Sequence, residues 1–171
     1  METSKFFNFI QADFLRYRQK YSMFSLVKLM MSSPGFRCVF ILRIQQFIGK
    51  TNTPYLPQII RLKLINSYGM DCSPGSKIGP GLRIEHSVGI VIGASTVIGK
   101  NATIMHGVTI GERYVDNRSD GKNPQIGDDV IIGISAIILG DIEIGDRVKI
   151  HAQSLVLRNV DDDSTISGKH K

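Results

Sequence analysis

From Cys72 onward, aliphatic residues recur at every sixth position, and glycine often follows them directly. The repeat runs in three registers: Ile78, Ile84 and Ile90; Ile92, Ile98, Ile104 and Ile110; and Ile126, Ile132, Ile138, Ile144, Ile150 and Val156. An α-helix repeats near 3.6 residues and a half-buried strand repeats at two, so neither explains this period. Six-residue units are typical of a parallel β-helix, in which three units make one coil and the aliphatic side chains fill a narrow core. The pattern therefore predicts a mainly β domain over residues 71–171.

Two breaks interrupt the repeat. Between Ile84 and Ile104 the chain inserts two extra residues, so that this coil is longer than three units of six. A longer break between Ile110 and Ile126 contains the polar stretch ERYVDNRSDGKNPQ at 112–125. This stretch must leave the coil as an extruded loop. Both a substrate contact and a plain solvated insertion fit such a loop.

The first 70 residues have a different pattern. Apolar residues recur there at three- and four-residue spacings, which favours α-helices. Breaks fall at 32–35 (SSPG) and at 51–57, where Pro54 and Pro57 cannot continue a helix. We expect a short N-terminal segment, residues 1–70, of two or three helices.

Charge is divided unevenly between these two parts. Residues 1–70 hold ten Lys/Arg against two Asp/Glu, whereas residues 71–171 hold eleven against thirteen. The excess of positive charge fits either the solvated faces of helices or attraction to an anionic polymer or membrane surface. No recognised nucleic-acid motif accompanies it, so we expect no nucleic-acid partner.

The cysteines and the apolar runs constrain the compartment. Cys38 and Cys72 lie far apart and form no CxxC pair, which argues against a disulfide framework or a zinc knuckle. The chain has no start of the signal-peptide type and no apolar run long enough to span a membrane. We expect a cytoplasmic protein, with the inner membrane surface as an alternative location because of the basic segment.

Two histidines are candidates for chemistry. His86 and His106 each lie two residues after a repeat residue, and the two repeat residues are one coil apart. They should therefore stack on one face, at roughly the 4.8 Å spacing of neighbouring strands. Histidine is the natural general base near neutral pH. A zinc site would need a third ligand, and His151 does not fall at a matching position, so we expect no metal.

The residues around these histidines resemble a known family. The runs 71–86 (DCSPGSKIGPGLRIEH) and 89–93 (GIVIG) are similar to the catalytic stretch of the serine acetyltransferases. The similarity continues through 107–111, 124–128 and 138–145. It implies a left-handed parallel β-helix and an O-acetyltransferase that uses acetyl-CoA as co-substrate.

The same resemblance implies roles for single residues. It makes His86 the general base, gives Asp71 the task of accepting the second ring N–H of His86, and turns Glu85 toward the substrate. It also implies a homotrimer in which neighbouring chains form the acetyl-CoA groove. The positions that match the cofactor contacts of the family are Gly111, Gly133, Ile134, Lys149 and Ala152.

Several departures bear on the acceptor. Lys122 and Asn123 stand where the serine enzymes carry an Arg-His pair, and Lys20 aligns near an acidic residue that helps to hold the amino group. The run 103–111 (TIMHGVTIG) resembles instead the O-acetyltransferases of the colanic acid biosynthesis type, which modify sugars of surface polysaccharides. The expected substrate-binding residues are Glu85, His106, Lys122 and Asn123.

These departures favour a carbohydrate acceptor, such as an anionic capsular polysaccharide or exopolysaccharide or its sugar precursor. The alternative is a serine O-acetyltransferase of cysteine biosynthesis. In a third interpretation, the coil is a binding scaffold or a metal-dependent hydratase. The histidines then have no role in acyl transfer.

Overall fold

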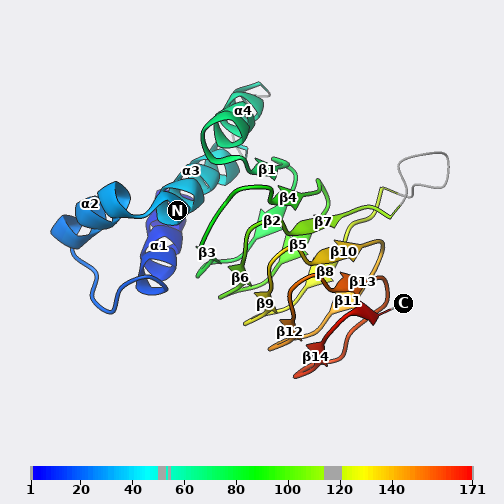
Figure 1. Cartoon of the computed structure of the whole chain (residues 1–171). Coiled ribbons are helices and arrows are strands. Elements are labelled where there is room, and N and C mark those ends of the chain that lie inside the picture. The colour runs from blue at the N-terminus through cyan, green and yellow to red at the C-terminus, as the bar shows by residue number, and fades with distance from the viewer. Residues whose placement is uncertain (1, 50–52, 54, 114–120, 171) are drawn as a thin grey trace.

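The computed structural model describes residues 2–49, 53, 55–113 and 121–170. Four helices come first in the chain, and a stack of short parallel strands follows them (Figure 1). The helices are α1 (Glu2–Leu15), α2 (Met23–Ser32), α3 (Pro34–Ile48) and α4 (Leu56–Tyr68). The described part of the N-terminal segment thus has more helices than the two or three expected.

Local sequence signals explain where the helices begin and end. Ser22 and Ser25 form a reciprocal capping box at the start of α2. Ser33 caps α3, and Pro34 takes the first helical position, where its missing N–H costs nothing. Gly69 ends α4 in the left-handed conformation, with a φ of 62°, and so turns the chain into the first strand.

The strands form three parallel sheets, so that three successive strands make one coil (Figure 1). Sheet A contains β1 (Asp71–Cys72), β4 (Val91–Ile92), β7 (Thr109–Gly111), β10 (Ile137–Leu139), β13 (Leu155–Val156) and β15 (Lys169–His170). Sheet B contains β2 (Lys77–Ile78), β5 (Val97–Ile98), β8 (Gln125–Ile126) and β11 (Glu143–Ile144). Sheet C contains β3 (Arg83–Ile84), β6 (Thr103–Ile104), β9 (Ile131–Ile132), β12 (Lys149–Ile150) and β14 (Thr165–Ile166).

The core confirms the six-residue repeat. Every aliphatic residue of the three predicted registers is buried. Ile84 pairs with Ile104 in register, as the coil with two extra residues requires. Burying one such side chain contributes about 1.5–3 kcal/mol, and every coil repeats the contribution. The predicted parallel β-helix with N-terminal helices is therefore present.

A buried ion pair joins the helices to the first coil. Arg43 of α3 donates to both carboxylate oxygens of Asp13 in α1, over 2.7 and 2.9 Å. The same guanidinium donates to the backbone carbonyls of Ile78 and Gly79, and Asp13 accepts the backbone N–H of Leu82. Both charges are paired and also hydrogen-bonded, which is the condition for burying them.

Close packing brings α3 and α1 to the strand that precedes His86. A Cβ at Gly35 would lie 2.1 Å from the carbonyl oxygen of Ile84, so only glycine lets α3 approach β3 this closely. The Tyr17 hydroxyl, just after α1, donates to that same carbonyl and accepts the Ile84 N–H, each over 2.8 Å. Burial raises the pKa of Tyr17. The helices therefore fix the backbone next to the candidate base.

The extruded loop predicted at 112–125 lies partly outside the described residues, at 114–120. The chain leaves sheet A at Gly111 and returns to sheet B at Gln125. No single helix within the described residues has the length and apolarity to cross a membrane. The pair α2 and α3, bent by 111° at their junction, meets those two criteria when taken together.

Candidate active site

His86 and His106 lie at the corner where the chain passes from sheet C to sheet A, here called the C–A corner. This corner comprises residues 85–90, 105–108, 133–136 and 151–154 of successive coils. The two imidazole rings meet edge to face, with centroids 5.9 Å apart. The predicted stacking of the two histidines is therefore correct. His86 is exposed and can reach a substrate, whereas His106 is half-buried.

Hydrogen bonds from one side chain and from the backbone hold this corner against the end of α4. The Ser87 hydroxyl donates to the carbonyl of Tyr68, and the N–H of Gly89 donates to the carbonyl of Gly69. Two residues further on, the N–H of Asp71 donates to the carbonyl of Ile90 over 2.8 Å. The segment that carries Asp71 and the turn that carries His86 thus run side by side.

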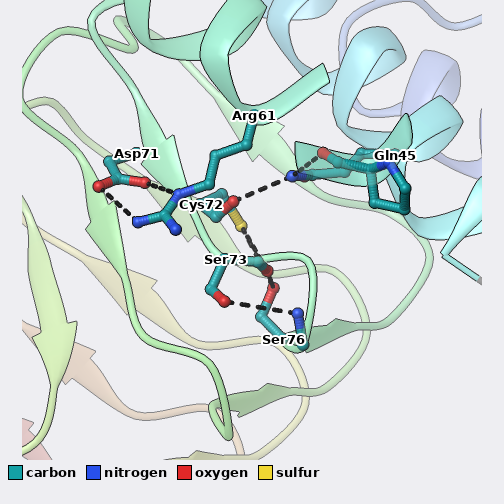
Figure 2. Close-up of polar contacts among 8 residues, drawn as sticks. Gln45, Arg61, Asp71, Cys72, Ser73 and Ser76 are labelled. Atoms are coloured by element: carbon teal, nitrogen blue, oxygen red, sulfur yellow. Dashed lines mark hydrogen bonds and ion pairs between the residues drawn. The ribbon is translucent and has the colours of Figure 1, made fainter. Parts of the chain in front are cut away.

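Asp71 itself is bound by Arg61 of α4 (Figure 2). The guanidinium donates to both carboxylate oxygens, over 2.5 and 2.9 Å, and these bonds raise the pKa of Arg61. In the part of the chain that the structure describes, no hydrogen bond joins Asp71 to His86. That Asp71 orients the base stays a prediction.

Glu85 is also held by an arginine. It forms an ion pair with Arg83, two residues before it on β3, and Arg83 in turn donates to the carbonyl of Arg16. The Arg83 guanidinium lies over the Tyr17 ring, 5.6 Å from its centroid. Glu85 remains half-exposed beside the candidate base, so a substrate-facing role is compatible with its position.

Lys122 and Asn123 lie at a different corner of the same chain, where sheet A passes to sheet B. Lys122 donates to Asp141 over 2.6 Å. Asn123 is buried and donates to the Ser95 hydroxyl over 2.7 Å. The structure therefore does not bring these two residues to His86 within one chain, and both have partners in neighbouring coils.

The predicted cofactor residues are divided between two places. Gly133, Ile134 and Ala152 lie in the C–A corner below His106, and Lys149 lies on the adjacent strand β12. Backbone hydrogen bonds connect this column, from Ser135 N–H to the His106 carbonyl and from Gln153 N–H to the Ile134 carbonyl. Gly111 lies apart, at the end of β7 in sheet A.

Sequence reasoning missed Arg61. It lies ten positions before Asp71 in α4, whose one other charged residue, Lys63, is exposed, and it belongs to no recognisable motif. Sequence reasoning also missed an unsatisfied group: Nδ1 of His106 is buried and has no hydrogen-bond partner among the described residues. Only the three-dimensional arrangement reveals either feature.

Comparisons with known proteins identify the family of the chain. Residues 123–158 match the bacterial transferase hexapeptide family (six repeats), and residues 89–115 match the hexapeptide repeat of succinyl-transferase. The serine acetyltransferase of Helicobacter pylori is 36% identical over 136 residues, which cover 79% of this chain and 78% of that protein. The chain belongs to the serine acetyltransferase family.

Other members of the family are longer. The serine acetyltransferase of Synechococcus elongatus is 31% identical over 83% of this chain but only 57% of its own length. The crystal structure of the Neisseria gonorrhoeae serine acetyltransferase superposes with a TM-score of 0.86 at 29% identity, covering 96% of this chain and 63% of that one. The chain therefore spans little more than half the length of several relatives that it matches.

These findings correct the prediction of a carbohydrate acceptor. The relatives and solved structures are named as serine acetyltransferases, and one structure is described as a complex with serine. The resemblance of residues 103–111 to polysaccharide-modifying enzymes is not supported, nor is a polysaccharide partner or a location at the inner membrane surface. Within one chain, Lys122 pairs with Asp141 and Asn123 with Ser95, and a contact of either residue with the substrate stays a prediction.

Proposed function

We propose that the protein is a serine O-acetyltransferase, which transfers the acetyl group of acetyl-CoA to the hydroxyl of L-serine. The observation that carries the proposal is the match to a serine acetyltransferase over more than three quarters of both chains. The exposed imidazole of His86 at the C–A corner supports it, because direct acyl transfer to a hydroxyl needs one accessible base.

In this reaction His86 removes the proton of the serine hydroxyl as the oxygen attacks the thioester carbonyl. The C–S bond then breaks, the CoA thiolate leaves with the electron pair, and it takes up the proton from His86, which restores the base. Glu85 and His106 border the same space and are the proposed contacts of the acceptor. Asp71 is the proposed orienting carboxylate, since it lies on the strand beside the His86 turn.

The proposed acetyl-CoA contacts are Gly133, Ile134, Ala152 and Lys149, with Gly111 on the neighbouring face. The first three line the same corner as the histidines, one and two coils below His106. The backbone there is close-packed, since a Cβ at Gly133 would lie 2.6 Å from the Ala152 nitrogen. The exposed Lys149 ammonium can pair with a phosphate of the cofactor.

A homotrimer is part of the proposal. Val91, Ile131, Ile134 and Ile137 are about two-fifths exposed on sheets A and C and the corner between them. A second copy packed there would cover these apolar side chains and supply the other wall of the cofactor groove. Such a copy would also bring its own A-to-B corner, with Lys122 and Asn123, toward the C–A corner. We also propose that the coil is left-handed, and that residues 1–70 form a helical segment and residues 71–171 form the acetyltransferase domain.

The test is release of free thiol from acetyl-CoA in the presence of L-serine, with mass spectrometry to identify O-acetylserine. Thiol release should require both substrates and should be weak with L-threonine or D-serine. Thiol release that is equally fast without any acceptor, or that needs an acceptor other than serine, would refute the proposal. Light scattering of the same sample tests the trimer.

A further inference from the structure

The bidentate pair between Arg61 and Asp71 lies where α4 meets the first strand, beside the candidate site. Arg61 comes from α4, while Asp71 is the first residue of β1, and the cap at Gly69 separates the helix from the strand. Both side chains are about one-third exposed, at 36% and 35%. Solvent therefore screens the pair, and its geometry is not explained by a need to hold the fold together.

The geometry is suited to fixing the orientation of the Asp71 carboxylate. Arg61 engages both of its oxygens through a planar fork, which removes the rotational freedom of the group. A carboxylate has about four lone-pair sites, so two of them remain for other donors. The backbone of Asp71 is fixed as well, by its bond to Ile90 in the turn that carries His86.

We infer that Arg61 is a positioning residue for the reaction, acting on His86 through the carboxylate of Asp71. This inference rests on the proposed function. In it, Arg61 presents the free edge of the carboxylate to the second ring nitrogen of His86 when substrate binds. It also partly neutralises the negative charge that His86 experiences. No change in the chemical steps is needed, because Arg61 neither gains nor loses a proton.

Several charged or titratable groups besides Arg61 lie near His86, and an experiment on Arg61 must leave them unchanged. The His106 ring contacts it from the next coil, and the ion pair of Glu85 with Arg83 lies directly before it. Asp71, with its Arg61 partner, lies on the adjacent strand. Lys63 lies two residues after Arg61 on α4 with an exposed side chain, and it provides a matched control of equal charge.

The first experiment is a kinetic double-mutant cycle. Arg61→Gln should lower kcat about 10-fold with little change in the KM for either substrate, since it disturbs orientation rather than binding. Arg61→Lys, which keeps the charge but loses the fork, should recover part of that loss. In an Asp71→Asn background, Arg61→Gln should lower kcat by less than about 2-fold, because the route through Asp71 is already gone. Lys63→Gln should leave kcat unchanged.

The inference would be overturned if Arg61→Gln lowered kcat by the same factor in the wild-type and the Asp71→Asn proteins. An unchanged or increased kcat in Arg61→Gln would also overturn it. Circular dichroism and thermal melting of each variant separate these outcomes from misfolding. A wild-type protein that does not acetylate serine would instead refute the proposed function, and the second experiment does not depend on turnover.

That second experiment compares the His86 imidazole signals of each variant with those of the wild type by NMR at one fixed pH, with His151 as an internal reference. Removing the Arg61 side chain frees the Asp71 carboxylate to rotate and changes the charge beside the His86 turn. The His86 ring signals should therefore move in Arg61→Gln and stay at their wild-type positions in Lys63→Gln. Unchanged His86 signals in Arg61→Gln, or equal changes in the two variants, would overturn the inference.

Discussion

The coils and the helices of this protein bury their side chains by different rules. In the coils, each repeat residue packs against the same position of the coil before and after it, as Ile84 does against Ile104. In the helices, the buried set depends on distant partners and includes the charged pair Arg43 and Asp13. A core built from its own repeats can be derived from sequence spacing alone, whereas a core built between unlike layers cannot.

The largest expected effect lies where the two regions meet, at the C–A corner. His86→Ala should lower kcat by about 10²- to 10⁴-fold, because the hydroxyl of the acceptor then loses its general base. Binding of acetyl-CoA should change little. Thiol release measures the first effect and calorimetric titration the second. His170→Ala is the matched control, since it removes an imidazole from the last strand of sheet A. Turnover within 3-fold of wild type in His86→Ala, a change of about 0.6 kcal/mol in the activation free energy, would contradict the assignment.

The buried ion pair of the helical layer should dominate its stability. Arg43→Met leaves the Asp13 carboxylate buried without its partner and should lower the free energy of unfolding by about 3–5 kcal/mol. Replacing both residues, with Asp13→Leu added, should recover a large part of that loss. Urea unfolding at neutral pH measures these differences.

The corresponding control lies in the coils. Arg147 forms an ion pair with Asp163 at the protein surface, and solvent screens it. Arg147→Met should therefore leave the unfolding midpoint close to that of the wild type. If Arg43→Met and Arg147→Met lowered the free energy of unfolding equally, the distinction between the buried ion pair of the helices and the exposed ion pair of the coils would be wrong.

Within the coils, the repeat should distinguish two neighbours on a single strand. Ile132 of β9 is fully buried, whereas Ile131 is 40% exposed on the outer face. Ile132→Ala should cost about 3 kcal/mol, from lost burial and from the cavity that it leaves. Ile131→Ala should cost less than about 1 kcal/mol in the folding of the chain, but it should weaken the proposed trimer.

Urea unfolding and light scattering measure these two quantities separately. A cost of similar size at both positions would contradict the assignment of inner and outer faces. An intact trimer in Ile131→Ala would exclude this part of sheet C from the subunit interface.

The sequence predicted the parallel β-helix, the coil with two extra residues between Ile84 and Ile104, and the stacking of His86 on His106. Each of these follows from counting repeats. The sequence did not predict that Arg61 binds Asp71, since ten residues and a helix end separate them. It also did not predict that Asn123 is buried against Ser95, and a contact of Asn123 with the substrate stays a prediction. When the partner of a residue comes from another coil or from the helices, the neighbouring sequence does not predict the contact.

The error about the acceptor came from departures from the family pattern at single positions. Lys122, one of these positions, pairs with Asp141 one coil away, and the spacing along the chain did not predict this contact. A departure from the pattern of a family changes the predicted chemistry only if the altered residue contacts the substrate. Spacing along the chain does not reveal that contact, whereas similarity to relatives over most of the chain does bear on function.

The smallest expected effect concerns the thiols that face the boundary between the two regions. Burial raises the pKa of Cys72 in β1 to about 11 and that of Cys38 in α3 to about 12. The unfolded chain releases these protons near pH 9, so between pH 9 and 11 the folded state holds protons that the unfolded state has lost. The free energy of unfolding should therefore fall as the pH rises, by roughly 1.4 kcal/mol per pH unit for each thiol.

Lysines and tyrosines titrate in the same range, so the thiol contribution must be measured as a difference between proteins. Cys72→Ala should show a shallower loss of stability from pH 9 to 10 than the wild type, by roughly 1 kcal/mol, in urea unfolding at fixed ionic strength. Cys38→Ala should show the same difference, because its thiol is buried from the helical side of the boundary. If only Cys72→Ala shows it, the helical layer exposes Cys38 before the coil unfolds, and the two regions do not unfold as one unit. Identical slopes in all three proteins would mean that neither thiol is shielded from water in the folded state.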